Sequence, residues 1–298
     1  MNTMPPTRAA LNRALGLAPQ RSLPTFAKPL HRRWPADDPS LPADAPAVAL
    51  YADTFTTHNE PEIGLAAKRV LEAFGYRVRL IRGTDAARAH ISTGLLPQAI
   101  RQTSRELDRL APWIEDESVE AILHCEPSVL SSITDDWLSL NIDRPIELRR
   151  RLAAKSALVE TFLAHRWDAH PRRPDIDPGI NQHAVDEIRL HAHCHQKALW
   201  GPGSSGDLLE RLWPGKVTTL DTTCCGMAGS FGYTADRYEL SLRIGELGVL
   251  PAARDTANQA SARVIMVAPG TSCRHQIHDG ADTEALHPMT LIDRIGLG

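Results

Sequence analysis

The stretch VALYADTFTTHNEPEIGLAAKRVLEAFGYRVRL, residues 48–80, contains the pattern from which the fold can be predicted. Its first four residues, Val48 to Tyr51, form a short apolar run that predicts a strand, and Pro61 suits the first position of a helix. Apolar residues then recur at helical spacing until Gly75, after which they alternate with arginines as in a second strand. This order of strand, helix and strand predicts a parallel, layered α/β unit.

The same alternation continues along the rest of the chain. The expected elements are a helix at 95–110, a strand at 119–123, a long helix at 146–165, a strand at 188–193, a helix at 208–213, a strand at 217–220, a helix from a cap at Asp236 to about Leu250, and a strand at 264–267. A segment rich in proline and arginine at 171–178 separates two groups of these elements and is typical of a linker.

The two groups of elements look like copies of one unit. Residues 50–54 (LYADT) can be laid over 190–194 (LHAHC), and residues 122–129 over 266–273. Two such copies favour a duplication with pseudo-twofold packing. We therefore expect an α/β fold of two tandem, pseudo-symmetric repeats, each with a parallel sheet flanked by helices. The expected boundaries are an N-terminal arm at 1–45, a first repeat at 46–168, a linker at 169–185 and a second repeat at 186–298.

The N-terminal arm differs in composition from the rest of the chain. It holds eight of the 22 prolines, and before Asp37 it contains basic residues but no acidic ones. Such a density of proline disfavours long helices and central strands. A docking arm or linker explains these features. A mitochondrial transit peptide, which is also arginine-rich and poor in acidic residues, is the alternative.

Composition argues against several classes of protein. Lys and Arg total 33 and Asp and Glu total 36, and the net charge of −3 argues against a protein that binds nucleic acid electrostatically. No run of about 18 apolar residues is present, so we expect no transmembrane segment. With five cysteines and no apolar secretory segment at its start, the chain is expected in the reducing cytoplasm.

Four of the five cysteines follow predicted strands of the second repeat. Cys194 ends the first strand, Cys224 and Cys225 follow the second, and Cys273 follows the third. The carboxyl ends of parallel strands share one edge of a sheet, where ligands usually bind. We therefore expect these four thiols to meet at that edge. Cys125 has no thiol neighbour in the sequence and is interpreted as structural.

Four converging thiols could hold zinc or an iron–sulfur cluster. Neighbouring residues have Cα atoms about 3.8 Å apart, so the sulfurs of Cys224 and Cys225 could not easily bind one small ion together. An iron–sulfur cluster is therefore favoured, and Gly226 leaves room for a bulky inorganic core. Buried structural thiols, and a vicinal pair that cycles to a disulfide, are the alternatives.

Several histidines lie close to these cysteines in the sequence. His193, His195 and His275 are candidates for alternative ligands or for hydrogen-bond donors to sulfur, although for any single histidine we expect a structural role first. In an extended strand, His191, His193 and His195 would point to the face opposite Cys194. One of them could turn inward only where the strand ends.

The cysteines also lie in recognisable motifs, which are HCHQK at 193–197, CCG at 224–226 and TSCRHQI at 271–277. Together these motifs resemble the cysteine-rich CCG domain. That domain occurs doubled in the cysteine-rich component of heterodisulfide reductase and in the iron–sulfur subunits of glycolate, lactate and glycerol-3-phosphate oxidases. The motifs look most like the C-terminal part of large FAD-linked oxidases that act on D-2-hydroxy acids. The resemblance covers about residues 46–295 and includes DTF at 53–55, EP at 60–61, ISTGLL at 91–96 and EPS at 126–128.

The first repeat departs from this family pattern. It has Asp85-Ala86-Ala87 in place of CCG and Val129 in place of a cysteine, so it cannot hold a cluster through thiols and is expected to be a scaffold. In the second repeat, Gln276 replaces the last cysteine of the pattern, which argues against a noncubane heterodisulfide-type cluster. A simpler cluster or zinc on the four thiols of the second repeat remains open, and we expect a cluster of the [4Fe–4S] type.

The resemblance also implies which partners this chain needs. The large oxidases have an FAD domain and a ferredoxin-like segment with a C-x2-C-x2-C-x3-C-P run, and neither is found here. We therefore expect an electron-transfer subunit that works with an FAD-containing dehydrogenase subunit and a ferredoxin-like iron–sulfur subunit. Any association with a membrane would be peripheral and through these partners. The alternatives are a non-catalytic, zinc-stabilised assembly module and a thiol hydrolase or transferase.

Overall fold

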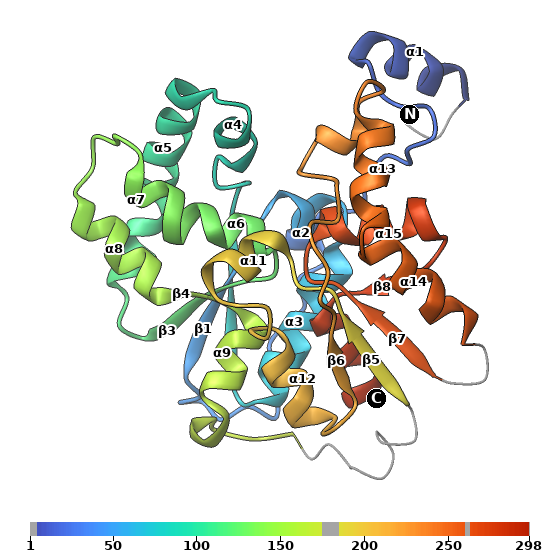
Figure 1. Ribbon diagram of the computed structural model, residues 1–298. Coiled ribbons are helices and arrows are strands. Elements are labelled where there is room, and N and C mark those ends of the chain that lie inside the picture. The colour runs from blue at the N-terminus through green and yellow to red at the C-terminus, as the bar shows by residue number, and fades with distance from the viewer. Residues whose placement is uncertain (1–4, 175–184, 260–262, 298) are drawn as a thin grey trace.

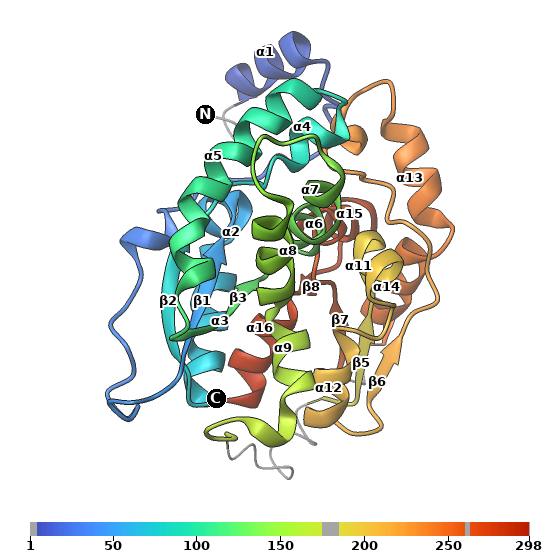
Figure 2. The same cartoon turned by 90° about the vertical axis from the view of Figure 1, so that its left-hand side faces the viewer.

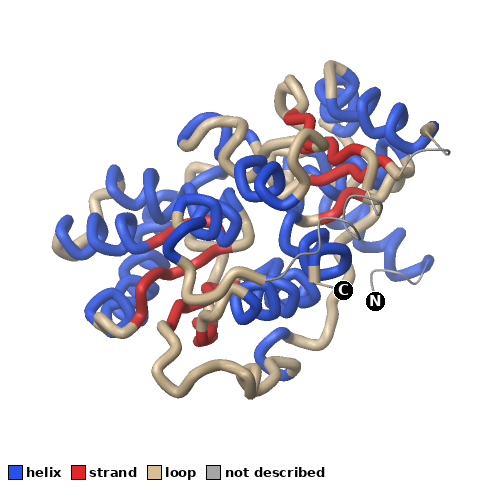
Figure 3. The backbone as a smooth tube through the Cα atoms, turned by 90° about the horizontal axis from the view of Figure 1, so that it is seen from below, coloured by secondary structure: helices blue, strands red, loops and turns tan. Residues whose placement is uncertain are grey.

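The computed structural model describes residues 5–174, 185–259 and 263–297. Its strands are β1 (Ala47–Ala52), β2 (Arg77–Arg82), β3 (Val119–His124), β4 (Ser156–Leu158), β5 (Glu187–Leu190), β6 (Val217–Thr219), β7 (Val264–Val267) and β8 (Ala285–Leu286). They form two four-stranded parallel sheets, in the orders β2-β1-β3-β4 and β6-β5-β7-β8 (Figures 1 and 3). The predicted α/β fold with two parallel sheets flanked by helices is confirmed.

Helices follow most of these strands. Those of the first half are α2 (Thr54–His58), α3 (Pro61–Ala73), α4 (Arg88–Ser92), α5 (Leu96–Glu115), α6 (Pro127–Ser131), α7 (Trp137–Ser139), α8 (Ile146–Lys155) and α9 (Val159–His165). Those of the second half are α11 (Cys194–Leu199), α12 (Gly206–Leu212), α13 (Tyr238–Glu246), α14 (Val249–Asn258), α15 (Thr271–Ala281) and α16 (Pro288–Leu291).

The two sheets repeat one topology. In the first sheet Leu50 of β1 pairs with Leu80 of β2 and with Leu123 of β3. In the second sheet Leu190 of β5 pairs with Thr219 of β6 and with Val267 of β7. Because β1 and β5 hold the same place between the same neighbours, the loops that follow them are structurally equivalent.

The long helix predicted at 146–165 is wrong. The chain forms α8, then the short strand β4, and only then α9. Residues 156–158 pair in parallel with residues 122–124 of β3, and Leu158 is buried. The sheet hydrogen bonds and the burial of Leu158 depend on β3, so helical spacing alone could not predict this break.

The single helix predicted from Asp236 to about Leu250 is also wrong, because two helices, α13 and α14, occupy this segment. Asp236 does not cap α13. The N-cap residue of this helix is Arg237, and its side chain makes no capping hydrogen bond. Gly248 separates the two helices. Pro251 lies in the first turn of α14, where proline is tolerated, whereas in the interior of one long helix it would remove a backbone hydrogen bond.

The two halves share one hydrophobic core. Its buried residues come from both sheets and from α3, α9, α12 and α16. The exchange is reciprocal, because α9 of the first half packs on α12 of the second, and α16 of the second half packs on α3 of the first (Figures 1 and 2). Neither half therefore completes its own core, although the sequence divides into two repeats.

The N-terminal arm lies across the second half and reaches the first. It begins with α1 (Pro5–Leu15), which was not predicted but keeps its prolines in the first turn. Leu17 forms an antiparallel bridge with Thr234, and the carbonyl of Thr25 accepts a hydrogen bond of 3.0 Å from the Asn59 side chain. The arm is thus attached to both halves of the fold.

Arg21 anchors this arm in the second half. Its side chain is buried, and its Nε donates a 2.8 Å hydrogen bond to the carbonyl of Gly232. Its guanidinium also donates to Ser241 Oγ at 3.0 Å and lies 3.6 Å from Asp279 Oδ2. A buried guanidinium with these partners fixes the position of the arm.

Most of the linker predicted at 169–185, namely residues 175–184, lies outside the described residues. Among the described residues, no helix combines the length and the apolar character needed to cross a membrane.

We expect Arg21→Ala to lower the free energy of unfolding by about 3 kcal/mol, because it leaves Asp279 largely buried without its cation. Urea unfolding followed by circular dichroism would measure the change. The matched control is Arg13→Ala on the exposed side of α1, which should shift stability by no more than about 0.5 kcal/mol. Equal losses in both variants would show that Arg21 does not anchor the arm.

Candidate metal centre

The four thiols predicted to converge lie on three segments that follow strands at the carboxyl edge of the second sheet. Cys194 is the first residue of α11 after β5, not the last residue of a strand as predicted. Cys224 and Cys225 lie in the loop after β6, and Cys273 lies in the first turn of α15 after β7. All five cysteines of the chain are free.

These thiols form one continuous chain of contacts. Cys194 and Cys224, Cys224 and Cys225, and Cys225 and Cys273 lie close enough for the two thiols of each pair to shift each other's pKa. The backbone N–H of Gly226 also donates to Cys224 Sγ at 3.3 Å. Each of the three segments contributes at least one thiol to this chain, so the contacts depend on the sheet that brings the segments together.

The contacts give the four sulfurs different proton affinities. Hydrogen bonds from Cys194 and Cys225 lower the pKa of Cys224, and a hydrogen bond from Cys225 lowers the pKa of Cys273. Their role as donors raises the pKa of Cys194 and Cys225, to which burial adds. Cys224 and Cys273 are therefore the sulfurs that the surroundings best prepare as thiolates.

His191 is a site residue that the sequence did not predict. It is buried, its Nδ1 lies 2.6 Å from Thr222 Oγ1, and it lies close enough to Cys273 to lower the pKa of that thiol. Its Nε2 makes no well-formed hydrogen bond to a described residue. The expectation that it faces away from the thiols assumed a strand to residue 193, but β5 ends at Leu190, so strict alternation stops there.

The histidines predicted around the thiols have other contacts. His193 is the N-cap of α11, with its Nδ1 accepting from the His195 N–H at 3.3 Å. His195 Nδ1 lies 2.8 Å from Ser131 Oγ of the first half. His275 Nδ1 lies 2.7 Å from the Tyr233 hydroxyl. These rings are thus used to cap α11 and to join segments around the centre.

Gly226 has a structural role that differs from the predicted one. Its φ is +93°, and a Cβ at this position would lie 2.2 Å from the carbonyl oxygen of Ser241 in α13. The space that this glycine leaves is filled by backbone, not by an inorganic core. The equivalent residue of the first half, Ala87, also has a positive φ, of 59°, so both loops make a similar turn.

Gln276 occupies the position at which the resembling family has its last cysteine. Its side chain is buried, and Nε2 donates to the carbonyl of Ser241 at 3.0 Å. Its Oε1 has no hydrogen-bond partner among the described residues. Gln276 Nε2 would also lie 3.2 Å from a Cβ at Gly226, so this side chain and the Ser241 carbonyl both pack against the turn.

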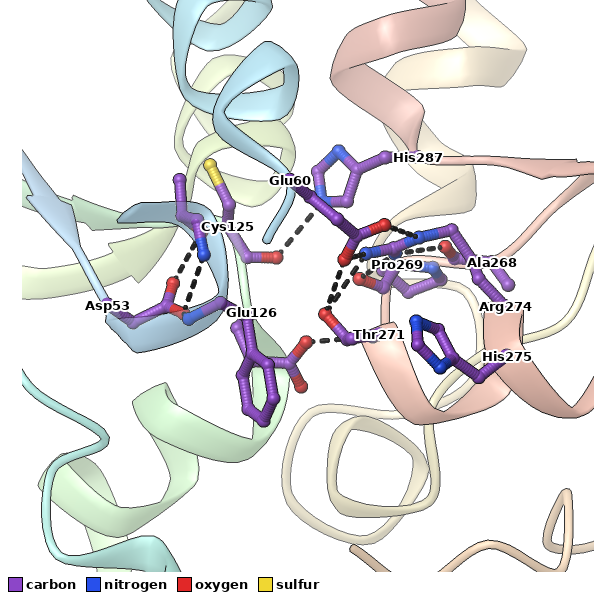
Figure 4. A network of polar contacts seen from close by, with 12 residues as sticks. Asp53, Glu60, Cys125, Glu126, Ala268, Pro269, Thr271, Arg274, His275 and His287 are labelled. Carbon is purple, nitrogen blue, oxygen red and sulfur yellow. Dashed lines mark hydrogen bonds and ion pairs between the residues drawn. The ribbon is translucent and has the colours of Figure 1, made fainter. Parts of the chain in front are cut away.

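A polar network attaches the thiol-bearing helix α15 to the first half (Figure 4). Buried Arg274 forms a bidentate pair with Glu60, at 3.1 Å from Nε to Oε1 and 2.6 Å from Nη2 to Oε2. Arg274 Nη1 donates to the carbonyls of Ala268 and Pro269 at 2.8 and 2.7 Å. Burial would raise the pKa of Glu60, but the charge and hydrogen bonds of Arg274 hold it at about 2.

Glu126 makes the second attachment of α15. Its Oε2 accepts from the N–H of Thr271, the first residue of α15, at 2.9 Å. Burial raises the pKa of Glu126, but nearby His193, the Thr271 N–H and Arg274 together keep it below its usual value. A carboxylate at a helix N-terminus is favoured by the helix dipole.

Cys125 is separate from the thiol chain. It is fully buried in the shared core, and burial raises the pKa of its thiol well above the usual value. Its carbonyl oxygen lies 3.0 Å from Nε2 of His287, which caps α16. The position of Cys125 agrees with a structural role.

The donor set was compared with the two groups expected from the sequence. Four thiols, including a vicinal pair, match iron–sulfur ligation in number and chemistry. Within residues 5–174, 185–259 and 263–297, no three or more His, Cys, Asp or Glu side chains are arranged around a point as ligands of one metal ion. The contact chain is therefore a set of donors that lie side by side, without a preformed tetrahedral site for a single ion.

The chain was also compared with known proteins. No protein-family model matches it. It is 23% identical over 293 residues to one of the subunits of the anaerobic glycerol-3-phosphate dehydrogenase of Escherichia coli K12, an alignment that covers 97% of this chain and 69% of that protein. It is 22% identical to the D-2-hydroxyglutarate dehydrogenases of Pantoea ananatis, over 246 residues, and of Escherichia coli K12, over 249 residues. These two alignments cover 82% of this chain but only 22% of each relative.

These relatives are dehydrogenases or subunits of them, and they support an oxidoreductase-related role for this chain. The finding agrees in part with the resemblance drawn from the cysteine motifs. It does not by itself define the CCG domain or a cofactor.

We expect Gly226→Ala to lower the free energy of unfolding by about 3 kcal/mol or more, because a Cβ would clash with the Ser241 carbonyl at a positive φ. The matched control is Gly229→Ala, also at a positive φ but with nothing within 4 Å of a Cβ, which should cost about 1–2 kcal/mol. Denaturant unfolding of both variants measures the difference. Similar losses would show that the close approach at Gly226 is unimportant.

Glu160 should make stability depend on pH. Burial raises its pKa to about 7 from 4.5, so the folded protein retains a proton that the unfolded chain releases. The contribution of Glu160 to the free energy of unfolding is therefore largest below about pH 4.5. It falls by up to about 3 kcal/mol as the pH rises to 7 and above. Glu160→Gln should remove this loss, so that its advantage over the parent protein grows between pH 5 and pH 8.

Urea unfolding at several pH values tests this expectation. Glu117→Gln, at an exposed loop position, is the control and should show the same difference from the parent protein at every pH. A difference for Glu160→Gln that stays constant with pH would contradict the role assigned to the Glu160 carboxyl.

Proposed function

We propose that this chain is an electron-transfer component of a dehydrogenase, with an iron–sulfur cluster of the [4Fe–4S] type held by its four clustered thiols. The observation that supports this proposal is the contact chain from Cys194 through Cys224 and Cys225 to Cys273. Thiols separated by long stretches of sequence gather there from three segments. When bound, such a cluster accepts and releases single electrons.

The residues around the thiols suit this function. His191 lies against Cys273, and the N–H of Gly226 donates to Cys224, so two of the four sulfurs have polar neighbours. Hydrogen bonds to ligand sulfurs and burial are the means by which proteins adjust the potential of such centres. Cys225 and Cys273 are almost fully buried, whereas Cys194 and Cys224 are partly exposed. An electron partner would approach the set from the side of Cys194 and Cys224.

The partners proposed are an FAD-containing dehydrogenase subunit and a ferredoxin-like iron–sulfur subunit. The support is the pattern of alignment, since one relative is named as part of a multi-subunit dehydrogenase, while this chain matches only 22% of the length of relatives that are named as whole dehydrogenases. Substrate oxidation would belong to the flavin partner. This chain would supply the route along which the electrons leave.

The test is metal analysis of protein purified without air. We expect iron and acid-labile sulfide, with a broad visible absorption that is lost on reduction. Ser substitution of Cys194, Cys224, Cys225 or Cys273 should each lower the iron content by more than half and lower the melting temperature, because metal binding is coupled to folding. The matched control is Cys125→Ser, which should retain its iron.

Two outcomes would contradict the proposal. A colourless protein with stoichiometric zinc would indicate the zinc-stabilised assembly module instead. Iron that is retained in all four single variants would show that these thiols are not its ligands.

A further inference from the structure

The first half has a pocket near the sheet edge that corresponds to the thiol-bearing edge of the second half. It lies beyond the carboxyl end of β2, between α4 and α5, which are neighbours in the fold (Figure 2). Its volume is about 480 Å³. The lining residues are Thr84, His90, Gln98, Arg101, Gln102, Arg105, Glu106 and Arg109. Ligands of parallel α/β folds usually bind at this end of the strands.

The charge of the lining is positive. It contains three arginines and one glutamate. Glu106 is already paired, since Arg109 Nη1 donates to its Oε2 at 2.8 Å and the Tyr51 hydroxyl donates to its Oε1 at 2.7 Å. Arg109 also donates to the carbonyl of Arg82. One of the three arginines is therefore used inside the protein to neutralise the only lining carboxylate.

The other two arginines are free to bind a ligand. Arg101 and Arg105 are one helical turn apart on α5 and both are exposed. Neither makes an ion pair or hydrogen bond within the described residues, although most other arginines of the first half do. Two unpaired guanidinium groups at this spacing can both donate hydrogen bonds to one oxyanion group.

The remaining lining groups are held in place by hydrogen bonds. Gln102 Nε2 donates to Asp85 Oδ1 at 2.6 Å, and Gln102 Oε1 lies 2.8 Å from His90 Nδ1. The second ring nitrogen of His90 is left for a ligand. The backbone N–H of Thr84 donates to the buried Tyr51 hydroxyl at 2.9 Å, which fixes the loop after β2. Asp85, which accepts from Gln102, adds one negative charge near the pocket. The two positive charges of Arg101 and Arg105 exceed it, so the net charge stays positive.

We propose that this pocket binds a small molecule with an oxyanion group, a carboxylate or a phosphate, through Arg101 and Arg105. The pocket size suits a compact metabolite, and a few fixed polar groups beside a pair of cations are typical of such sites. The proposal goes beyond electron transfer and does not depend on the thiols. It gives the first half, which has no thiol at the positions equivalent to the four clustered cysteines, a binding site of its own.

The experiment is a thermal-unfolding titration of the full chain with succinate and, separately, with inorganic phosphate, at constant ionic strength set with sodium chloride. We expect a saturable rise in melting temperature with at least one of the two anions, because a ligand that binds only the folded state stabilises it. Whichever anion saturates at the lower concentration identifies the oxyanion class. No saturable rise with either would overturn the proposal.

Variants assign the effect to the pocket. R101Q/R105Q should weaken the apparent affinity by about tenfold or more, since both charge-assisted contacts are lost. The control R150Q/R151Q removes two exposed arginines from α8 and should leave the affinity unchanged. The single variants R101Q and R105Q serve if the double variant is unstable. Equal loss in the pocket and control variants would show that the anion responds only to net charge, and the proposal would then be wrong.

Discussion

The arrangement depends most on the ion pair between buried Arg274 and partly exposed Glu60, which joins the two halves beside a thiol. Arg274 is adjacent to Cys273 in α15, and only 7% of its surface is exposed. Its guanidinium is satisfied by Glu60 of the first half and by two carbonyls of its own half. A buried charge that lost its partner would cost several kilocalories per mole, so the position of α15 is tied to the presence of the first half.

The shared hydrophobic core also makes each half depend on the other, because its buried residues come from both. α9 of the first half packs on α12 of the second half, and α16 of the second half packs on α3 of the first half. In each half, the helix that follows the fourth strand of the sheet thus packs on a helix of the other half. The first half has no thiols at the positions equivalent to those of the second half, but it completes the core and supplies Glu60 and Glu126 to the thiol-bearing helix.

The two sheet edges show how one topology can hold different chemistry. Tyr51 of β1 and His191 after β5 occupy matching positions. Tyr51 is buried against Glu106 and Thr84, whereas His191 lies against Cys273. In the first half the loop after β2 borders a pocket with free arginines, while in the second half the loop after β6 carries Cys224 and Cys225. Local side chains, not the backbone path, determine which chemistry each edge supports.

The parallel α/β class, the doubling and the placement of four cysteines after three strands could be predicted from local patterns, because strand and helix periods are local properties. The break at β4, the early end of β5 and the inward position of His191 were decided only by the tertiary structure. Each depends on a distant segment: β3 for residues 156–158, and Thr222 and Cys273 for His191. The Arg274–Glu60 pair joins residues 214 positions apart, and no local pattern predicts which buried charge meets which partner.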